Sequence, residues 1–515
     1  MSIRHKILAA VMSTALLMSG CGSDQSANTA TDEKTFTYGT VAYGVAMENA
    51  GTNPHESYSG WSTLRYGIGE TLFKFNQSMK LEPWIAADFE QLDAFTIKIN
   101  LKPNVKFSNG KPVDGNAVKK CLEHLIANHD RAPSDLKIES ITADGNSITI
   151  HSTEKTPALL NYLSDPYGCI IDVDAGFEDQ IAIGTGPYKA IKVSDTEIEL
   201  VKNEEYWGDT KPKLDRIKIK SITDGDTLTM AMQNGELDAV QGLPYSSLKL
   251  FKDDPNFKLS QTDTSRIYQI AFNFDMDFIQ EPNLRRAISM SVDKNNFTDV
   301  LLSGNGTPAV GPFPANLPFG DQTVSTVPFD LDGAQQLLND IGWSDSDGDG
   351  YLDRDGRTLE LNYLTYTSRQ ELPLLAEMLQ ADLKKIGVKL NINATDNYKS
   401  VLKSGNYDMF SKAIVTAPTG DPEYYFTSHI VSGAVDNAGH YNSPTLTALE
   451  ERLHNTYGAD NRAALAIKMS QQVLDDCALI YASRLKMSFV MKNNVEGFSA
   501  HPSDYYEITS ALDKT

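Results

Sequence analysis

The hydrophobic and polar positions along the chain repeat with two different periods. In residues 95–101 (FTIKINL) apolar and polar side chains alternate, and residues 388–392 do the same, which predicts strands with one buried face. Residues 118–127 (VKKCLEHLIA) and 372–386 instead place apolar side chains three and four positions apart, which predicts amphipathic helices. Because the two patterns alternate along the chain, they favour a mixed α/β fold.

Both halves of the chain contain further segments of these two kinds. Strands are predicted at 35–45, 148–150, 198–201, 266–274, 359–365 and 480–490, and helices at 62–75, 283–292, 445–457 and 461–478. No fixed period relates these segments, which argues against a solenoid or a propeller. Two α/β lobes of comparable size are the simplest interpretation. No segment after residue 20 is apolar for long enough to cross a bilayer.

Length and charge narrow the class of protein. The chain has 515 residues, of which 41% are hydrophobic and 22% charged. Chains beyond about 250–300 residues usually divide their core, so we expect two or three structural units. The formal charge is -22 at pH 7, and an acidic surface repels nucleic-acid phosphates and anionic lipid headgroups. We therefore expect no nucleic acid among the partners.

The amino-terminal segment has the pattern of an export signal followed by a spacer. An apolar run at 7–18 is too short to span a bilayer, and small residues after it lead to Cys21. This arrangement resembles the cleavage site of bacterial lipoproteins, in which the cysteine carries the lipid. We expect a signal peptide at 1–20, lipidation of Cys21 and a tether at 21–34; an ordinary secretory peptide cut nearby is the alternative. The protein would then be extracytoplasmic, held at the cell membrane by its lipid alone.

The other cysteines and the catalytic motifs point away from several classes. Cys121, Cys169 and Cys477 are widely spaced and contain no CxxC, which excludes a disulfide framework and the usual zinc motifs. At most one disulfide can form, and burial as small apolar side chains is expected for the rest. Because no HExxH, GxSxG or P-loop motif occurs, we expect no enzyme. An extracellular hydrolase that uses paired carboxylates is a third alternative.

Several short segments, taken in their order along the chain, are similar to one family of binding proteins. They are LKPNVKFSNGKPV at 101–113, GTGPY at 184–188, NGELDA at 234–239 and NLRRAISMSVD at 283–293. They resemble the large extracytoplasmic solute-binding proteins of ABC importers, the family 5 group that carries oligopeptides, dipeptides and nickel complexes. The resemblance covers nearly the whole mature chain. The glycines of GTGPY are expected to adopt backbone angles closed to other residues, as a chain crossing between lobes would need.

The resemblance implies a two-lobed, periplasmic-binding-protein-like α/β fold of type II, in its large class, with an extra inserted domain. One lobe is expected at 35–67, 184–268 and 486–515, the inserted domain at 68–183 and the other lobe at 269–485. The ligand would bind in a cleft between the lobes, which close over it by a hinge motion. The expected partners are a small-molecule ligand and ABC permease subunits. The chain itself is expected to be a monomer that requires no cofactor.

A difference from the peptide-binding members bears on the ligand class. In those members an aspartate that pairs with the peptide ammonium lies four positions before the proline of a Gly-Asp-Pro segment, and here that position is Pro418. Burying an ammonium without a counter-ion is costly, so a free peptide amino terminus loses its usual anchor. Asp421 either substitutes for that aspartate or caps the helix expected at 423–430.

Two other features resemble the nickel and metallophore branch of the family. They are YSGWSTLRYGIGETLF at 58–73 and the Ala-Pro pair that precedes Asp421. In that branch an organic chelator holds the metal, which implies arginines for its carboxylates, an aromatic wall and one protein histidine. A guanidinium matches a carboxylate with paired hydrogen bonds, which favours Arg65 and Arg266; salt bridges unrelated to a ligand are the alternative. The other ligand candidates are Tyr58, Trp61, Thr416, Pro418, Tyr424 and Tyr425, and core packing is the alternative for the aromatic ones. The metal candidates are His440 and His429, and for each of them an ordinary surface or core histidine is the alternative.

An acidic segment offers a separate cation signal. Residues 345–356 (DSDGDGYLDRDG) carry Asp345, Asp347 and Asp349 at alternate positions with a glycine after the third, like the start of an EF-hand calcium loop. The twelfth residue is Gly356 rather than the usual glutamate. A structural calcium site and a solvated acidic turn therefore both remain open.

These observations lead to a prediction of function. We predict the ligand-capturing lipoprotein of an ABC importer, which binds a nickel or other transition-metal chelate and delivers it to a permease. The alternative ligand is an oligopeptide or a dipeptide. In either case the protein would bind and release its solute without changing it chemically.

Overall fold

The computed structural model describes residues 33–41 and 51–515. The predicted signal peptide, Cys21 and most of the predicted tether lie outside the described residues. Among the described helices, none combines the length and the apolar character needed to cross a membrane.

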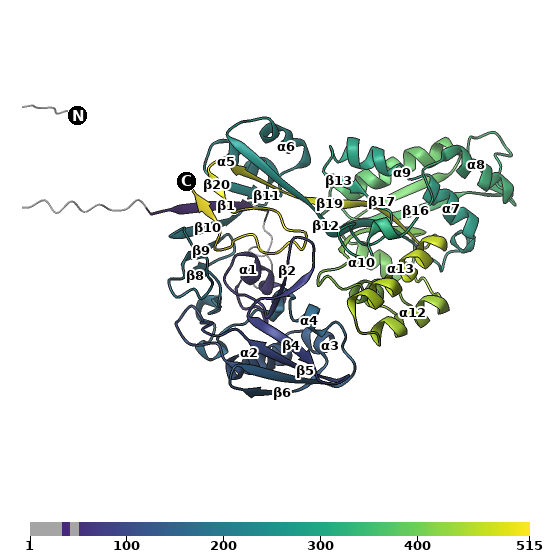
Figure 1. The fold of residues 1–515 in the computed structure, drawn as a ribbon. Coiled ribbons are helices and arrows are strands. Elements are labelled where there is room, and N and C mark those ends of the chain that lie inside the picture. The colour runs from purple at the N-terminus through teal and green to yellow at the C-terminus, as the bar shows by residue number, and fades with distance from the viewer. Residues whose placement is uncertain (1–32, 42–50) are drawn as a thin grey trace, which may run out of the picture. The chain divides into compact units, whose positions relative to one another are not determined.

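One mixed sheet of eleven strands runs through the described chain (Figure 1). Its strands are β1 (Thr35–Thr40), β8 (Tyr188–Val193), β9 (Glu197–Lys202), β10 (Arg216–Ser221), β11 (Ala239–Gln241), β12 (Phe257–Phe272), β13 (Gly306–Pro308), β16 (Glu360–Thr365), β17 (Lys389–Ala394), β18 (Met409–Val415) and β19 (Leu479–Lys492). Their order is β17-β16-β18-β12-β19-β11-β1-β10-β9-β8, and β13 pairs with β19. We call the β1 and β8–β11 side the first lobe and the β16–β18 side the second lobe.

The long strands β12 and β19 join the two lobes. They have 16 and 14 residues and pair with each other in antiparallel fashion along most of their length. β19 also pairs with β11 of the first lobe, and β12 pairs with β18 of the second. The register of the β12–β19 pair shifts between Asp263 and Ile267, which is the signature of a β-bulge and of a local bend. The sheet therefore continues from lobe to lobe through an irregular pair of strands.

A second, four-stranded sheet belongs to a separate domain below the first lobe in Figure 1. It consists of β4 (Ala86–Gln91), β5 (Thr96–Leu101), β6 (Ile138–Asp144) and β7 (Ser147–Ser152), in the order β4-β5-β7-β6. The helix α2 (Gly115–Asn128) begins after Asp114, whose side chain accepts the amide of Ala117 at 2.9 Å. Its buried face includes Val118 and Leu122, which pack in one cluster with β5 residues. The alternation of β5 and the helical period of α2 were thus both correctly predicted.

The remaining elements are helices and short strand pairs that cover these sheets. The helices are α1 (Ser59–Arg65), α3 (Ala132–Leu136), α4 (Leu159–Tyr162), α5 (Gly225–Gln233), α6 (Tyr245–Lys252), α7 (Pro282–Met290), α8 (Leu331–Asp340), α9 (Glu371–Lys385), α10 (Tyr398–Ser404), α11 (Glu423–His429), α12 (Pro444–His454) and α13 (Ala459–Asp475). The short strands are β2 (Phe73–Phe75), β3 (Leu81–Pro83), β14 (Asp353–Arg354), β15 (Arg357–Thr358), β20 (Val495–Glu496) and β21 (Asp513–Lys514). Short 3₁₀ turns lie at Pro166–Gly168, Val173–Ala175, Glu178–Gln180, Phe278–Gln280 and Asp321–Thr323, and a π-helix at Asn296–Leu301.

The buried apolar residues form separate clusters. One contains only residues between 72 and 182 and fills the four-stranded domain, which we call the inserted domain. Others fill the first lobe and combine residues near the amino terminus with residues of 487–512. The clusters of the second lobe lie between 267 and 482, joined by Phe75 and Met79. The predicted limits of the domains themselves stay a prediction.

The predicted helix at 62–75 was wrong after Arg65. α1 ends at Arg65, and Gly67 has a φ of +67°, the left-handed conformation that commonly ends a helix. The chain then turns into β2. The apolar residues of this segment are buried because they pass through a covered turn, and their helical spacing was therefore misleading.

The GTGPY segment requires glycine for a reason other than the predicted one. Neither Gly184 nor Gly186 has a positive φ. Instead the amide of Gly186 donates to the carbonyl of Ile68 at 3.0 Å, and a Cβ on Gly186 would lie 2.2 Å from the carbonyl oxygen of Gly67. Close backbone contact, not an unusual backbone angle, excludes a side chain here.

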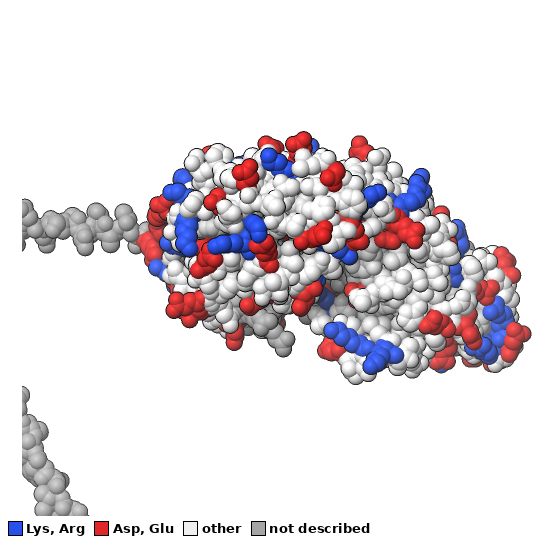
Figure 2. Space-filling model, turned by 90° about the horizontal axis from the view of Figure 1, so that it is seen from below, with Lys and Arg blue, Asp and Glu red and all other residues white. Residues whose placement is uncertain are grey.

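The state of the cysteines is the one expected from the sequence, and the surface charges are of both signs. Cys121, Cys169 and Cys477 are buried and none of these three forms a disulfide, as expected for small apolar side chains. On the face shown in Figure 2, acidic and basic side chains are interspersed, so the net negative charge is not gathered there in one patch.

Candidate functional site

A cavity of about 520 Å³ lies between the two lobes. Val41, Thr223 and residues 241–245 line it from the first lobe, directly after β1, β10 and β11. Residues 368–371 line it from the second lobe, shortly after β16. Loops at the carboxyl ends of strands are the usual ligand-binding position in open α/β sheets. We call this space the interlobe cavity.

Arg266 borders the interlobe cavity from within the irregular part of β12. Its side chain is 13% exposed, and its Nη2 lies 3.8 Å from the Asp504 carboxylate. Burial raises the pKa of Asp504, although the charges of Arg65 and Arg266 oppose this. Arg369 and Glu371 border the same space. The cavity thus presents two guanidinium groups next to carboxylates, as a ligand that carries both charges would require.

Arg65 forms salt bridges inside the protein. Its side chain is 3% exposed and lies 3.0 Å from the Asp504 carboxylate and 3.1 Å from that of Glu507. Its Nη2 also donates to the backbone carbonyl of Asp504 at 2.8 Å. Burial raises the pKa of Glu507 to about 8, although Arg65 lowers it. The observed contacts are therefore those of the alternative interpretation, a salt bridge that ties α1 to the carboxyl-terminal segment.

Tyr58 and Trp61 border a small hollow of about 100 Å³ on the inserted domain. Arg131, which the sequence analysis missed, lies in the same hollow and pairs with Asp165 at 2.8 Å. Tyr424 of α11 is close enough for the charges of Arg131 and Asp165 to act on its hydroxyl, whose pKa is raised mainly by burial. Three of the predicted aromatic residues are thus gathered around an arginine.

Three other ligand candidates make contacts inside the protein, and none of them lines the interlobe cavity. The Thr416 hydroxyl donates to the carbonyl of Pro312 at 2.8 Å and is buried. The carbonyl of Pro418 accepts the hydroxyl of Tyr505 at 3.3 Å. Tyr425 has no exposed surface and packs in the core, where its hydroxyl donates to Gln269 at 3.0 Å. The buried hydroxyls of Thr416 and Tyr425 are thus satisfied by hydrogen bonds inside the protein, as buried polar groups require.

Asp421 precedes Pro422, the N-cap residue of α11, and binds both the first residue of the helix and a buried arginine. Its Oδ1 accepts the amide of Glu423 at 2.9 Å. The Arg462 guanidinium donates to both carboxylate oxygens of Asp421, at 2.6 and 2.8 Å, and to Glu423 at 2.6 Å. All three side chains are less than a tenth exposed. Asp421 therefore has a counter-ion within the protein and does not substitute for the missing ammonium anchor.

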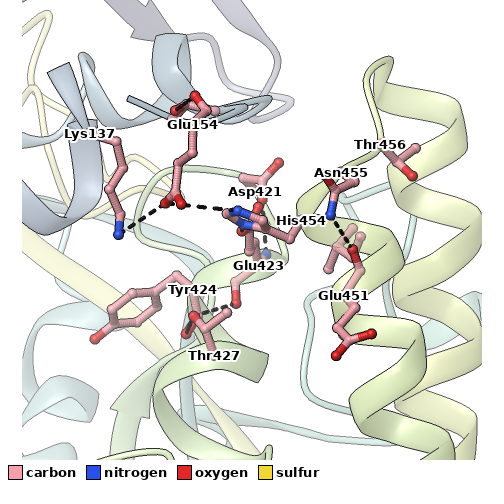
Figure 3. A network of polar contacts seen from close by, with 12 residues as sticks. Lys137, Glu154, Asp421, Glu423, Tyr424, Thr427, Glu451, His454, Asn455 and Thr456 are labelled. Carbon is pink, nitrogen blue, oxygen red and sulfur yellow. Dashed lines mark hydrogen bonds and ion pairs between the residues drawn. The ribbon is translucent and has the colours of Figure 1, made fainter. Parts of the chain in front are cut away.

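The same network reaches the inserted domain through His454 (Figure 3). Its Nδ1 lies 2.7 Å from Glu423, and its Nε2 lies 4.0 Å from Glu154 of the inserted domain, which pairs with Lys137 at 3.0 Å. The hydrogen bond to Glu423 raises the pKa of His454, although partial burial opposes it. A charged chain of side chains thus connects the second lobe to the inserted domain.

Comparison with known protein families decides what kind of protein carries these features. The family described as "Bacterial extracellular solute-binding proteins, family 5 Middle" matches residues 80–436, more than half of the chain. The chain belongs to this family. It is therefore a solute-binding protein of an ABC importer and not an enzyme.

Similar proteins bind different solutes. The nickel-binding protein NikA of Staphylococcus aureus is 26% identical over 512 residues, which covers 98% of each chain. The glutathione-binding protein GsiB of Pectobacterium atrosepticum is 26% identical over 359 residues and covers 67% of each. A solved nickel ABC transporter structure from Bacillus halodurans is 28% identical, has a TM-score of 0.82 and covers 93% of this chain and all of its own. Staphylococcus aureus NikA in complex with Ni(L-His)2 has a TM-score of 0.75 at 24% identity and covers 94% of this chain and 100% of its own.

These comparisons confirm the fold that was expected. The mixed α/β arrangement matches that of periplasmic binding proteins, with an extra domain. The interlobe cavity of this solute-binding protein lies where the predicted cleft would be. Membership of the family does not decide whether the ligand is a metal chelate or a peptide, because relatives of both kinds match at similar identity.

The two histidine candidates lie in different surroundings. His429 of the solute-binding protein is buried, and its Nδ1 is 3.3 Å from the Lys412 ammonium. Burial lowers its pKa to about 3, so the ring is neutral, and its Nε2 is buried without a hydrogen-bond partner among the described residues. The side chain of His440 is 45% exposed and pairs with Asp275 at 2.5 Å. Within the described ranges, neither belongs to a group of three or more side chains that could hold a metal.

The acidic segment of the solute-binding protein does contain such a group. Ligand atoms of Asp345, Asp347 and Asp353 all lie within 4.8 Å of one another. Asp353 follows in β14 and was missed by the sequence analysis, whereas Asp349 is outside the group and accepts the amide of Tyr351 at 2.8 Å. The calcium site stays a prediction, with this different third ligand.

Proposed function

We propose that this solute-binding protein captures a transition-metal chelate, with nickel as the leading metal, and delivers it to an ABC permease. Its nickel-binding relative matches the chain almost from end to end, whereas the glutathione-binding relatives match about two thirds of it. The lipid on Cys21 would hold the protein at the membrane, close to the permease.

The residues of the interlobe cavity support a chelate better than a bare ion. Among the described residues, no group of three ligating side chains lies at this cavity. Arg266 and Arg369 do lie there. A guanidinium repels a bare cation but forms paired, charge-assisted hydrogen bonds with a carboxylate. A metal that arrives inside a carboxylate-bearing chelator therefore fits this cavity, and its ligands would come mainly from the chelator, because neither His429 nor His440 lines the cavity.

The short-peptide alternative has weaker support in the geometry. The position that anchors a peptide ammonium is Pro418, and the nearby carboxylate of Asp421 is already paired with Arg462. Breaking a buried pair of this kind to accept a ligand costs several kcal/mol. Among the described residues, Asp504 beside Arg266 and Glu371 are the carboxylates that line the interlobe cavity and could meet an amino group.

Calorimetric titration distinguishes these ligands. The mature protein would be titrated with nickel chloride alone, with nickel and L-histidine together, with glutathione and with a dipeptide mixture. We expect tight, saturable binding for nickel with L-histidine and much weaker binding for the other three. Tight binding of glutathione or of dipeptides, with none for the nickel complex, would overturn the proposal.

Substitution of Arg266 tests the role of the guanidinium. Arg266→Ala should weaken chelate binding by more than about 1.5 kcal/mol, because a charge-assisted pair is lost. Arg266→Lys keeps the charge without the paired geometry, so its affinity for the chelate should lie between those of the wild type and of Arg266→Ala. Arg357→Ala is the matched control, since Arg357 is 61% exposed and does not line the interlobe cavity. Equal affinity of Arg266→Ala and the control would remove Arg266 from the site.

A further inference from the structure

A second cavity of about 600 Å³ lies beside the first lobe and the inserted domain. Its lining comes from the end of α1 and the following turn, from β2 and β3, and from the carboxyl-terminal segment 497–511. No described residue between 269 and 485 lines it, although residues of that range form one wall of the interlobe cavity. We call it the side cavity, and it is distinct from the proposed chelate site.

Aromatic side chains form much of the wall of the side cavity. Trp84 packs edge-on against Tyr506, with ring centroids 5.6 Å apart, and Phe75 and Phe498 extend this surface. His501 is buried beside Tyr506, and burial lowers its pKa to about 4, so its ring adds no charge. Such a wall suits the apolar, flat part of a small molecule.

The buried carboxylate at this cavity is fully engaged by the protein. Glu70 accepts the hydroxyl of Tyr206 and the indole of Trp207, each at 2.7 Å, and the hydroxyl of Thr185 at 3.0 Å. Burial raises its pKa to about 7 in spite of these hydrogen bonds. Glu70 therefore fixes the position of the Tyr206 ring at the cavity and has little capacity left for a ligand.

A second pair of charges is arranged differently. Lys74 of β2 and Glu82 of β3 are directly opposite each other in the strand register, a position in which opposite charges usually pair. The contacts described for these two side chains are with other residues. The Lys74 ammonium instead lies 5.1 Å from the centre of the Trp84 ring, and Glu82 accepts the amide of Asn76 at 2.7 Å. The two opposite charges are thus held apart at the border of one cavity.

We propose that the side cavity binds a zwitterionic amino acid with an aromatic side chain. Its carboxylate would pair with Lys74, its ammonium with the second oxygen of Glu82, and its ring would lie against Trp84 and Tyr506. Separated opposite charges match a zwitterion, whereas a simple anion would be repelled by Glu82 and a simple amine by Lys74. This inference is independent of what the interlobe cavity binds.

Calorimetry with three related probes tests the charge requirement. L-phenylalanine carries both charges, phenylacetate only the carboxylate and phenethylamine only the ammonium. We expect one equivalent of L-phenylalanine to bind, and each of the other probes to bind at least about tenfold more weakly. Absence of saturable binding of L-phenylalanine would overturn the proposal, and so would phenylacetate binding of equal strength.

Substitutions locate the site. Lys74→Met and Glu82→Gln should each weaken L-phenylalanine binding at least about tenfold. Lys80→Met is the matched control, because Lys80 is exposed in the turn of the same hairpin and does not line the side cavity. Circular dichroism and thermal unfolding would establish that all variants are folded. Unchanged binding by both cavity variants would overturn the proposal.

One further experiment distinguishes the two proposed sites. Arg266→Ala should leave the L-phenylalanine affinity unchanged, because Arg266 does not line the side cavity. If Arg266→Ala abolished L-phenylalanine binding while Lys74→Met did not, the amino acid would be a ligand of the interlobe cavity and the proposal would be overturned. Failure of nickel binding alone would contradict the proposed function but not this site.

Discussion

The Arg462 network makes the sharpest prediction about stability. Arg462→Met keeps a long apolar side chain and removes the guanidinium that Asp421 and Glu423 share. The side chains of the arginine and both carboxylates are only 5%, 9% and 8% exposed, so solvent cannot replace the lost charge. After the substitution only His454 still provides Glu423 with a hydrogen-bond partner of opposite charge.

The expected loss follows from the burial of these charges. Removing one member of a buried ion pair costs about 3–5 kcal/mol, because the remaining charge stays uncompensated. Here two carboxylates lose the same partner, and Glu423 keeps His454. We therefore expect the free energy of unfolding to fall by about 3–5 kcal/mol at neutral pH. The pKa values of both carboxyl groups should rise in the variant, so the loss should become smaller as the pH falls and they bind protons.

Urea unfolding, followed by tryptophan fluorescence and circular dichroism, measures this loss. A variant that combines Arg462→Met with Asp421→Asn and Glu423→Gln is the control, because it removes the charges that the single substitution leaves unpaired. The combined variant should be more stable than Arg462→Met alone. A loss below about 1 kcal/mol for the single variant, the size of an exposed pair, would refute the reasoning. The same conclusion would follow if the combined variant were the less stable of the two.

Two further predictions concern a proton and a cation. The pKa of His454 is raised in the folded protein, so its contribution to stability is fully present below its usual pKa of 6.5 and is lost as the pH rises through the raised value. The pKa of Glu423 is lowered, so its contribution to stability is lost as the pH falls below its usual pKa of 4.5. Wild type should therefore exceed His454→Gln in urea stability by more at about pH 5–6 than above about pH 8, and equal differences would contradict this assignment. Calcium should raise the unfolding temperature of the wild type but not that of a variant that combines Asp345→Asn with Asp347→Asn. If neither calcium nor EDTA changed the unfolding temperature of the wild type, the segment would be a solvated acidic turn.

Local patterns in the sequence predicted the secondary structure well where one face of an element is buried. The alternation in β5 and the helical spacing in α2 and α9 follow directly from which face packs on a core. The pattern failed after Arg65, because residues that pass through a covered turn are apolar for the same reason as residues of a helix. The order of the strands in the large sheet was not predicted, because periodicity shows which face of a strand is buried and not which strands are neighbours.

The site was harder to predict because its contacts join residues that are far apart in the chain. Arg65 meets the carbonyl of Asp504 across 439 positions, and Asp421 meets Arg462 across 41. Nothing near an arginine in the sequence shows whether its carboxylate partner belongs to the protein or to a ligand. Arg131 was missed for the same reason, since its role depends on a hollow formed by separate segments. The resemblance identified the family and the fold correctly, but it did not show which side chains were already paired.

The shift of register between β12 and β19 has a consequence for how ligand capture and lobe movement are related. Arg266 lies between Asp263 and Ile267, within the stretch where the two strands are out of step. A β-bulge changes the direction of a strand, and any change in its angle also swings the side chains that it carries. The guanidinium that borders the interlobe cavity is therefore carried by the irregular stretch of β12 that joins the lobes. If the lobes close over a ligand as expected for the family, a ligand paired with Arg266 would be held by the same strand that connects the two halves of the protein.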